Sequence, residues 1–352
     1  MRSTESCDGW PVSTRADSPE RGVVAQNPIM TTVRDRLALA VDIGGTKFAA
    51  AIVNESGEVL VAQRIATPRT PNREDLFGAL TTVIDATLQS AGLTLTDPAL
   101  VPAIGLGTAA PLDINAGTIS PVNIAGWRLF PIRDRLVERY SVPVGMIGDA
   151  VAVAVGEHWK GAARGNRNVL GMVVSTGVGG GLILDGRAMV GSTGNAGHIG
   201  HASVDPDGPV CVCGGIGCLE AIASGPSMAA WARDNGFVGG DGSAVAIADA
   251  AVKGDRVALA AFRRSGEALG MAIASAVTLL DLDLVVIGGG VAAAGSLLFE
   301  PLGAAYTRYA ALGFASAPRV VPALLGAEAG LIGAAAVVLV PEAYWPTESA
   351  DR

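Results

Sequence analysis

Two stretches decide the fold: Leu37-Ala-Leu-Ala-Val-Asp-Ile-Gly-Gly-Thr-Lys47, running on into the apolar residues 48–53, and Asn168-Val-Leu-Gly-Met-Val-Val-Ser-Thr-Gly-Val-Gly-Gly-Gly181, running on into residues 182–184. In each, an apolar strand-like run ends in a glycine-rich turn, and a second apolar run follows at once. The strand–turn–strand unit therefore occurs twice. This repetition predicts an α/β protein made of two similar halves with a cleft between them.

The rest of the chain is consistent with two α/β halves. Apolar runs predict further strands over 58–65, 101–105, 142–147 and 284–287, and helical periodicity predicts helices over 73–91, 131–140 and 255–280. We expect a small α/β domain over 36–147, a large α/β domain over 148–327, and a C-terminal helix over 328–345 that returns to the small domain. Residues 1–35, rich in Ser, Pro, Asp and Arg, predict a disordered leader, with Met30 as an alternative start.

Composition narrows the class of protein. The chain has 352 residues, of which 50% are hydrophobic and 16% charged, with a net charge of −8. These values indicate a globular protein and argue against nucleic acid as the main partner. No apolar run reaches membrane-spanning length, and the first residues lack the hydrophobic region of a signal peptide. We therefore expect a cytoplasmic protein without a membrane partner.

The two glycine turns are candidate phosphate loops. Glycines let backbone N–H groups converge on phosphate oxygens, and Thr46 and Thr176 add hydroxyl donors. Neither turn has the spacing of a P-loop, and in neither does a helix follow at once, as a dinucleotide-binding turn requires. Lys47 is open to two interpretations, a phosphate contact or a solvated strand residue.

A third cluster predicts a metal site. His201 precedes Cys211-Val-Cys213-Gly-Gly-Ile-Gly-Cys218, which together supply one imidazole and three thiolates. This is a closed tetrahedral ligand set for a structural Zn²⁺. The alternative is a disulfide pair with a spare thiol.

Asp149 follows a predicted buried strand and opens a helix. An acidic residue at that place can cap the helix. It can equally stand at the mouth of the cleft as a general base. The residue pattern leaves both roles open.

Taken together, the two glycine turns and the motif from His201 to Glu220 resemble the ROK family of sugar kinases, repressors and open reading frames, over residues from Leu37 to about 339. The resemblance implies an actin-like ATPase (ribonuclease H-like) two-domain fold with an interdomain cleft. It further implies ATP with Mg²⁺ as phosphoryl donor, a hexose as acceptor, a structural Zn²⁺ and a homodimer.

The resemblance also implies roles for individual residues. Asp149 matches the catalytic base, and Asn123, His201 and Glu220 match sugar contacts, with His201 also a zinc ligand beside Cys211, Cys213 and Cys218. The positions matching nucleotide or Mg²⁺ contacts are Asp42, Gly44, Gly45, Thr46, Lys47, Thr176, Gly177, Gly179, Gly288 and Gly289.

Two departures from the family pattern bear on the substrate. His198 stands where glucokinases of the family usually carry Glu, and it can donate as well as accept a hydrogen bond, which suits an acetamide at C2. In this respect the motif is similar to that of bacterial N-acetylmannosamine kinases. Gly148 stands where the family has Asn before the base, so one side-chain amide expected to hold a sugar hydroxyl is missing.

The resemblance thus implies ATP-dependent phosphorylation of the 6-hydroxyl of a hexose, with N-acetylmannosamine as the favoured substrate and glucose as the alternative. A non-catalytic sugar sensor is a further reading, because of Gly148. A repressor of the family needs a DNA-binding domain before the first turn, and residues 1–36 show no helical periodicity. We therefore expect no nucleic-acid partner.

Overall fold

The first half of the fold is a five-stranded mixed sheet. The computed structural model describes residues 36–345, so the predicted leader over 1–35 lies outside the described residues. The strands are β1 (Leu37–Ile43), β2 (Lys47–Asn54), β3 (Val59–Ala66), β4 (Leu100–Thr108) and β7 (Val144–Gly148). They lie in the order β3-β2-β1-β4-β7, with β1 to β3 antiparallel and β4 and β7 parallel to β1.

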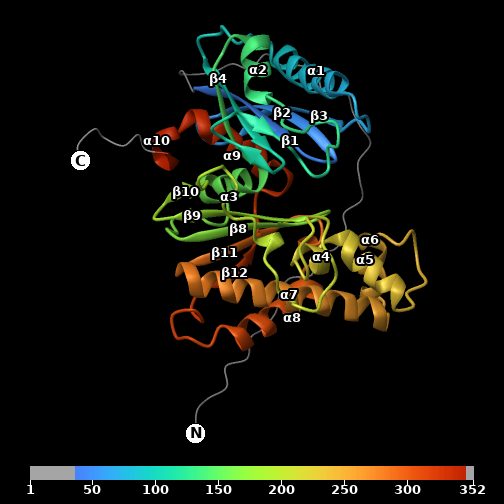
Figure 1. Cartoon of the computed structure of the whole chain (residues 1–352). Helices are drawn as coiled ribbons and strands as arrows, with labels where there is room; N and C mark the ends of the chain where they lie inside the picture. The colour runs from blue at the N-terminus through green and yellow to red at the C-terminus, as the bar shows by residue number, and fades with distance from the viewer. Residues whose placement is uncertain (1–35, 346–352) are drawn as a thin grey trace. The chain divides into compact units, whose positions relative to one another are not determined.

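The second half repeats this topology. Its strands are β8 (Val169–Val174), β9 (Val178–Leu184), β10 (Arg187–Met189), β11 (Leu284–Gly288) and β12 (Arg319–Pro322). They lie in the order β10-β9-β8-β11-β12, again an antiparallel meander followed by two parallel strands. The duplication that the two glycine turns predict is therefore present in the sheets (Figure 1).

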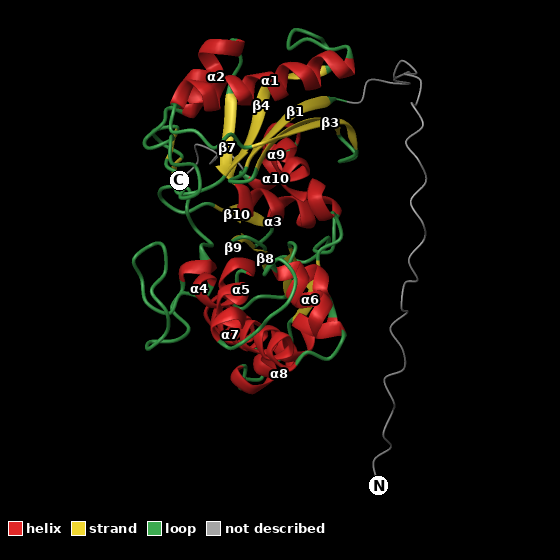
Figure 2. Ribbon diagram, turned by 90° about the vertical axis from the view of Figure 1, so that its right-hand side faces the viewer, coloured by secondary structure: helices red, strands yellow, loops and turns green. Residues whose placement is uncertain are grey.

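Helices cover both sheets. In the first half α1 (Arg73–Ala91) and α2 (Ile132–Tyr140) connect strands, and in the second half α7 (Arg256–Leu280) and α8 (Ser296–Tyr309) do so. The helices α7 and α8 pack along each other, as both views show (Figures 1 and 2). Their buried faces complete the large core beside β8 and β11, which includes Phe262, Leu269 and Leu298.

Two further helices connect the halves. The helix α3 (Asp149–Lys160) packs on β8 and β9, α9 (Ala329–Leu339) packs on β1 and β4, and the two helices pack against each other. Glycines allow the close approach: a Cβ on Gly333 would lie 1.7 Å from the Ala152 carbonyl oxygen, and one on Gly156 would lie 2.3 Å from that of Ala329. Because both helices begin at the edge where β1 and β7 end, this contact fixes the surroundings of Asp42 and Asp149.

The remaining elements are short. They are β5 (Leu112–Asp113), β6 (Thr118–Ile119), α4 (Glu220–Ala223), α5 (Gly225–Asp234), α6 (Ala244–Val252), α10 (Pro341–Tyr344) and the single helical turns Ile199–His201, Ala292–Ala294 and Gly326–Glu328. Within residues 36–345, none of the helices combines the length and the apolar character that crossing a membrane requires.

The structure differs from the sequence predictions in two places. The strand β9 begins at Val178, so Gly179, Gly180 and Gly181 belong to the strand and not to the turn. The predicted C-terminal helix over 328–345 is two helices, α9 and α10, separated at Val340, where Pro341 begins the second. The boundaries of the two domains stay a prediction.

Candidate functional site

Two carboxylates lie at neighbouring strand ends. Asp42 pairs with Gly107 of β4, and Gly107 pairs with Ile147 of β7, two residues before Asp149. Because the three strands are parallel, their carboxyl ends meet at one edge, which is where ligands bind in such sheets. The strand pairing therefore brings Asp42 and Asp149 together.

The two carboxyl groups are buried and interact electrostatically. Burial raises the pKa of Asp149 to about 7, and the negative charge of Asp42 adds to that rise. Burial likewise raises the pKa of Asp42 to about 6, although the charges of Lys47 and Arg64 oppose the rise. Two carboxylates titrating near neutrality are suited to proton transfer or to binding a cation.

Asp149 does not cap its helix. The N-cap of α3 is Gly148, which makes no side-chain hydrogen bond, and Asp149 is the first helical residue. Its Oδ1 accepts only the neighbouring Ala150 N–H, at 2.7 Å. Asp149 is therefore not the N-cap residue, although its carboxylate accepts one of the free N–H groups of the first turn.

The first glycine turn is tied to the loop that carries Asn123. The turn closes with a hydrogen bond from the Gly44 N–H to the Lys47 carbonyl, at 3.0 Å, and the Thr67 hydroxyl donates to the Gly44 carbonyl. A Cβ on Gly45 would lie 2.7 Å from the Asn123 Cβ. The structure thus places Asn123 directly against the first turn.

The second glycine turn is tied to Glu220. Ser175 donates its N–H to the Gly177 carbonyl at 2.8 Å, which closes the turn. Glu220, the first residue of α4, accepts the Val178 N–H on Oε2 at 2.9 Å. A Cβ on Gly177 would lie 2.6 Å from the same oxygen. Glycine therefore lets the carboxylate approach the turn this closely without shifting.

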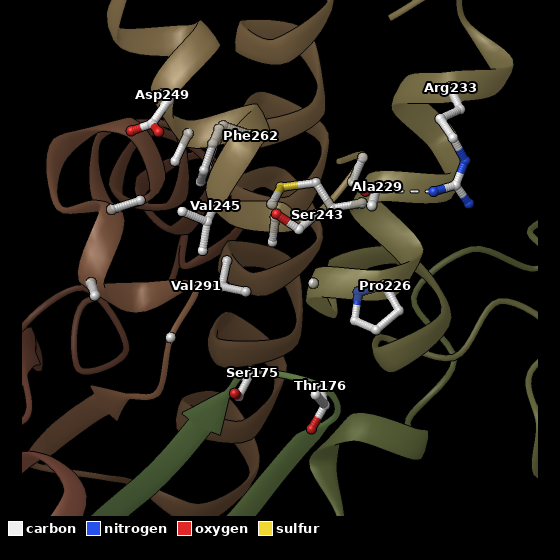
Figure 3. A pocket seen from close by; sticks show the side chains of 18 residues that line it. Ser175, Thr176, Pro226, Ala229, Arg233, Ser243, Val245, Asp249, Phe262 and Val291 are labelled. Carbon is white, nitrogen blue, oxygen red and sulfur yellow. Dashed lines mark hydrogen bonds between the residues drawn. The ribbon is translucent and has the colours of Figure 1, made fainter. Parts of the chain in front are cut away.

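A cavity of about 650 Å³ opens beside the second turn (Figure 3). Ser175 and Thr176 lie at one end of it, and the apolar side chains of Met228, Val245, Phe262 and Val291 line its walls. Gly290 lies in the lining, and its neighbour Gly289 has φ +98° and approaches the Val174 carbonyl so closely that a Cβ would lie 2.4 Å from it. This apolar cavity with hydroxyls at one end suits a nucleotide base and its first phosphates.

The cysteine and histidine cluster fits a zinc ion. Sγ of Cys213 and Sγ of Cys218 lie 3.7 Å apart, and Sγ of Cys211 lies 3.7 Å from Nδ1 of His201. The four ligand atoms all lie within 4.8 Å of one another. A tetrahedral Zn²⁺ with Zn–S bonds of about 2.3 Å places two thiolate sulfurs ~3.8 Å apart, whereas a disulfide needs about 2.05 Å. The donor set and the spacing therefore match zinc and exclude the disulfide alternative for this pair.

His198 and His201 lie on one turn beside this cluster, with ring centroids 6.2 Å apart. His198 Nδ1 lies 2.9 Å from the Asn195 carbonyl, and burial lowers its pKa. The neutral ring must donate from Nδ1, because the carbonyl only accepts. Its Nε2 is consequently an acceptor. With Nδ1 of His201 toward the thiolates, Nε2 of that ring is a donor.

Hard oxygen donors for a magnesium ion are also present. Asp42 and Asp149 supply carboxylates at the sheet edge, and the Asp42 carboxyl lies against Gly330 at the start of α9, 3.7 Å from where a Cβ would be. Mg²⁺ binds proteins through one or two carboxylates and takes its other ligands from water and phosphates. The two carboxylates therefore fit such an ion.

The chain matches the model of the ROK family over residues 38–340, and it belongs to that family. It is 32% identical to a glucokinase of Thermotoga maritima over 85% of this chain and 96% of the relative. It is 37% identical to an N-acetylmannosamine kinase of Yersinia pseudotuberculosis over 72% of this chain and 82% of the relative.

A solved structure of a family member has a similar fold. A ROK family glucokinase from Streptomyces griseus, in complex with glucose and AMPPNP, superposes with a TM-score of 0.73 at 34% identity, covering 86% of this chain and 99% of that one. The fold is accordingly that of ROK kinases, with the mixed sheets of an actin-like ATPase, as the sequence predicts.

The sequence does not predict some of the residues around the site. The apolar lining of the larger cavity, such as Met228, Phe262 and Val291, carries no motif and looks like any buried position. Trp231 and Arg264, which line a second cavity beside Glu220, are separated from it in sequence and gave no signal either. Only the folded chain brings them together.

Proposed function

We propose that this ROK protein is an ATP-dependent kinase that transfers the γ-phosphoryl group to the 6-hydroxyl of a hexose. The observation that carries the proposal is the position of Asp149, a carboxylate beside Asp42 at the edge where β1, β4 and β7 end. Asn123 and Glu220 border the two glycine turns at the same site. A base, phosphate loops and polar sugar contacts are the parts that such a transfer needs.

The reaction balances on these groups. Asp149 takes the proton of the 6-hydroxyl as that oxygen forms a bond to the γ-phosphorus, and the bond from phosphorus to the β,γ-bridging oxygen breaks to release ADP. A base with a pKa of about 7 is ionised in a large share of molecules at neutral pH and still accepts a proton. Asp149 would also orient the hydroxyl for attack.

The nucleotide would lie in the cavity of about 650 Å³ with its phosphates toward Thr176. The N–H groups of both glycine turns would hold phosphate oxygens without moving, since each turn is closed by its own hydrogen bond. Asp42 would hold Mg²⁺, which neutralises developing charge on the phosphates when it is bound.

The sugar that we favour is N-acetylmannosamine. His198 is neutral and presents Nε2 as an acceptor, which matches the N–H of an acetamide at C2. A carboxylate at that position would carry a full charge and favour hydroxyl donors. The 37% identity to an N-acetylmannosamine kinase supports this choice.

Glucose is the second candidate. Glucokinases from Thermotoga maritima and Streptomyces griseus align over more of this chain than the N-acetylmannosamine kinase does. Glu220 and His201 offer an acceptor and a donor that suit the hydroxyls of either sugar. The identity of residue 198 is therefore the feature that separates the two candidates.

A coupled ADP-release assay over a panel of hexoses and N-acetylhexosamines tests the proposal. We expect kcat/KM for N-acetylmannosamine to exceed that for glucose, and His198→Glu to shift the ratio toward glucose. The matched control is His158→Gln, because His158 lies in α3 against Tyr344 and away from the site. Preference for glucose in the wild type would make the protein a glucokinase, and no turnover with any sugar would refute the kinase.

A further inference from the structure

A second cavity, of about 350 Å³, adjoins the proposed sugar contacts. Asn123, Thr176 and Glu220 belong to its lining, so it reaches the place where the acceptor sugar would bind. The rest of the lining comes from elements that have no part in the phosphoryl transfer. These are the zinc loop around Cys211 and the helices α5 and α7; Ala221 of α4 and Ser224 complete the lining.

One face of α5 forms a wall of this cavity. Ser227, Ala230, Trp231 and Asp234 all line it, at the spacing that places side chains on one side of a helix. From Pro226 beside the phosphate turn to Asp234 the helix rises about 12 Å. A single pyranose ring held by Glu220 and Asn123 would leave most of this wall without a contact.

The polar groups on that wall suit a neutral sugar ring. The Arg264 guanidinium lies 5.8 Å from the Trp231 ring centroid and donates one hydrogen bond, to the Ile222 carbonyl. Within residues 36–345 no carboxylate lies in ion-pair range of Arg264. Burial lowers the pKa of Arg264, and the negative charge of the more distant Asp205 opposes that fall. The other four N–H donors of Arg264 make no hydrogen bond to residues 36–345, so they can donate to a ligand. The exposed Asp234 adds acceptors, and the indole offers a flat apolar face.

The loop that carries Cys211 forms another part of the lining and also suits a sugar ring. Val210 and Val212 flank the zinc ligand Cys211 and are 74% and 77% exposed, although Cys211 itself is buried. Aliphatic side chains held outward by a metal-anchored loop are typical of a surface that a ligand covers. The α5 and α7 side supplies a donor in Arg264, an acceptor in Asp234 and an apolar face in Trp231. The loop adds a second apolar face through Val210 and Val212. Together these groups match the hydroxyls and the C–H faces of a pyranose.

We propose that this cavity is a second sugar subsite, which holds a neutral pyranose ring linked to the ring that is phosphorylated. The proposal rests on the proposed function and extends its substrate class from hexoses to disaccharides. Trp231 packs on the second ring, Arg264 donates to its hydroxyls and Asp234 accepts from them. The transferred phosphoryl group and the base are unchanged.

The test compares the best monosaccharide acceptor with the same sugar carrying a glucosyl residue, using ADP release and competition binding. We expect at least one glucosylated form to be phosphorylated with a lower KM than the monosaccharide. Trp231→Ala and Asp234→Asn should each raise that KM about tenfold and leave the monosaccharide KM within about twofold. Val238→Ala is the control, since Val238 is 97% exposed and does not line the cavity.

Two results distinguish a failure of the proposed subsite from a failure of the proposed kinase function. If the monosaccharide is phosphorylated but no glucosylated form binds more tightly, the subsite is refuted while the kinase stands. If no sugar is phosphorylated, the proposed function fails first. Asp234→Asn alters an exposed side chain, so its effect can be measured even if Trp231→Ala lowers stability. If Asp234→Asn raises KM equally for the monosaccharide and for its glucosylated form, the subsite is also refuted.

Discussion

Glu220 Oε2 lies 2.9 Å from the Val178 backbone nitrogen, so a carboxylate proposed to contact the sugar is also bonded to the phosphate turn. A Cβ at Gly177 would lie 2.6 Å from the same oxygen, so any larger residue there would displace the carboxylate. The proposed sugar site and the proposed nucleotide site are therefore joined through one side chain. A substitution in either site is expected to alter ligand binding at the other.

Removing the Glu220 carboxylate should weaken sugar binding. We expect Glu220→Ala to raise the sugar KM by about 10- to 100-fold, because hydrogen bonds to a charged group are lost. Glu220→Gln, which keeps an acceptor for Val178, should lie between the variant and the wild type. Steady-state kinetics with Glu267→Ala, an exposed site on α7, as control will show this. An unchanged KM in Glu220→Ala would remove Glu220 from the sugar site.

The contact between Gly45 and Asn123 gives a second prediction. Gly45→Ala places a Cβ 2.7 Å from the Asn123 Cβ, so the loop that carries Asn123 must shift. We expect the sugar KM to rise by about 3- to 10-fold, in line with a misplaced polar contact. Gly78→Ala is the control, since a Cβ at Gly78 meets nothing within 4 Å. If both variants behave alike, Asn123 makes no contact that matters for the sugar.

Zinc should be stoichiometric and structural. We expect one Zn²⁺ per chain, and a fall of about 10 °C in Tm when a strong chelator or Cys213→Ser removes it. Sugar affinity should fall with it, because His201 and Glu220 flank the zinc loop. Elemental analysis and thermal melts of the purified protein measure both effects. Protein that holds no zinc and melts unchanged in chelator would contradict this assignment.

The acidic pair predicts how stability depends on pH. The folded-state pKa of Asp149 is raised from 3.8 to about 7 and that of Asp42 to about 6, so the folded protein binds protons more tightly than the unfolded chain. This contribution is complete below pH 3.8 and is lost as pH rises to about 7. We expect Asp149→Asn to raise Tm at pH 8 by a few degrees without Mg²⁺ or nucleotide, and by less at pH 5. A larger gain at pH 5 would contradict the assignment.

The strands and the duplicated topology were predictable because apolar runs broken by glycine carry a strong local signal, as in 37–47 and 168–184. The role of Gly180 and Gly181 was not. They lie inside β9, where a Cβ would lie 2.7 Å from the Gly197 carbonyl and 2.6 Å from Val151 Cα. These glycines serve packing between distant segments, a requirement that no local pattern reveals.

The clustering of His201 with the three cysteines and the place of Asp149 after a buried strand could be predicted from residue types and spacing. The cavity walls could not. Phe262, Trp231 and Arg264 come from α5 and α7, and their shared position depends on how these helices pack. Tertiary packing, and not local chemistry, therefore decides the lining of the proposed second sugar subsite.

The most direct test of the kinase is Asp149→Asn, which keeps the shape of the side chain and removes its basicity. Turnover in the hexose-dependent ADP-release assay should fall by about two to four orders of magnitude, while sugar binding measured by calorimetry stays within about threefold. Turnover close to that of the wild type would contradict the account, because Asp149 would then not be the base that accepts the hydroxyl proton.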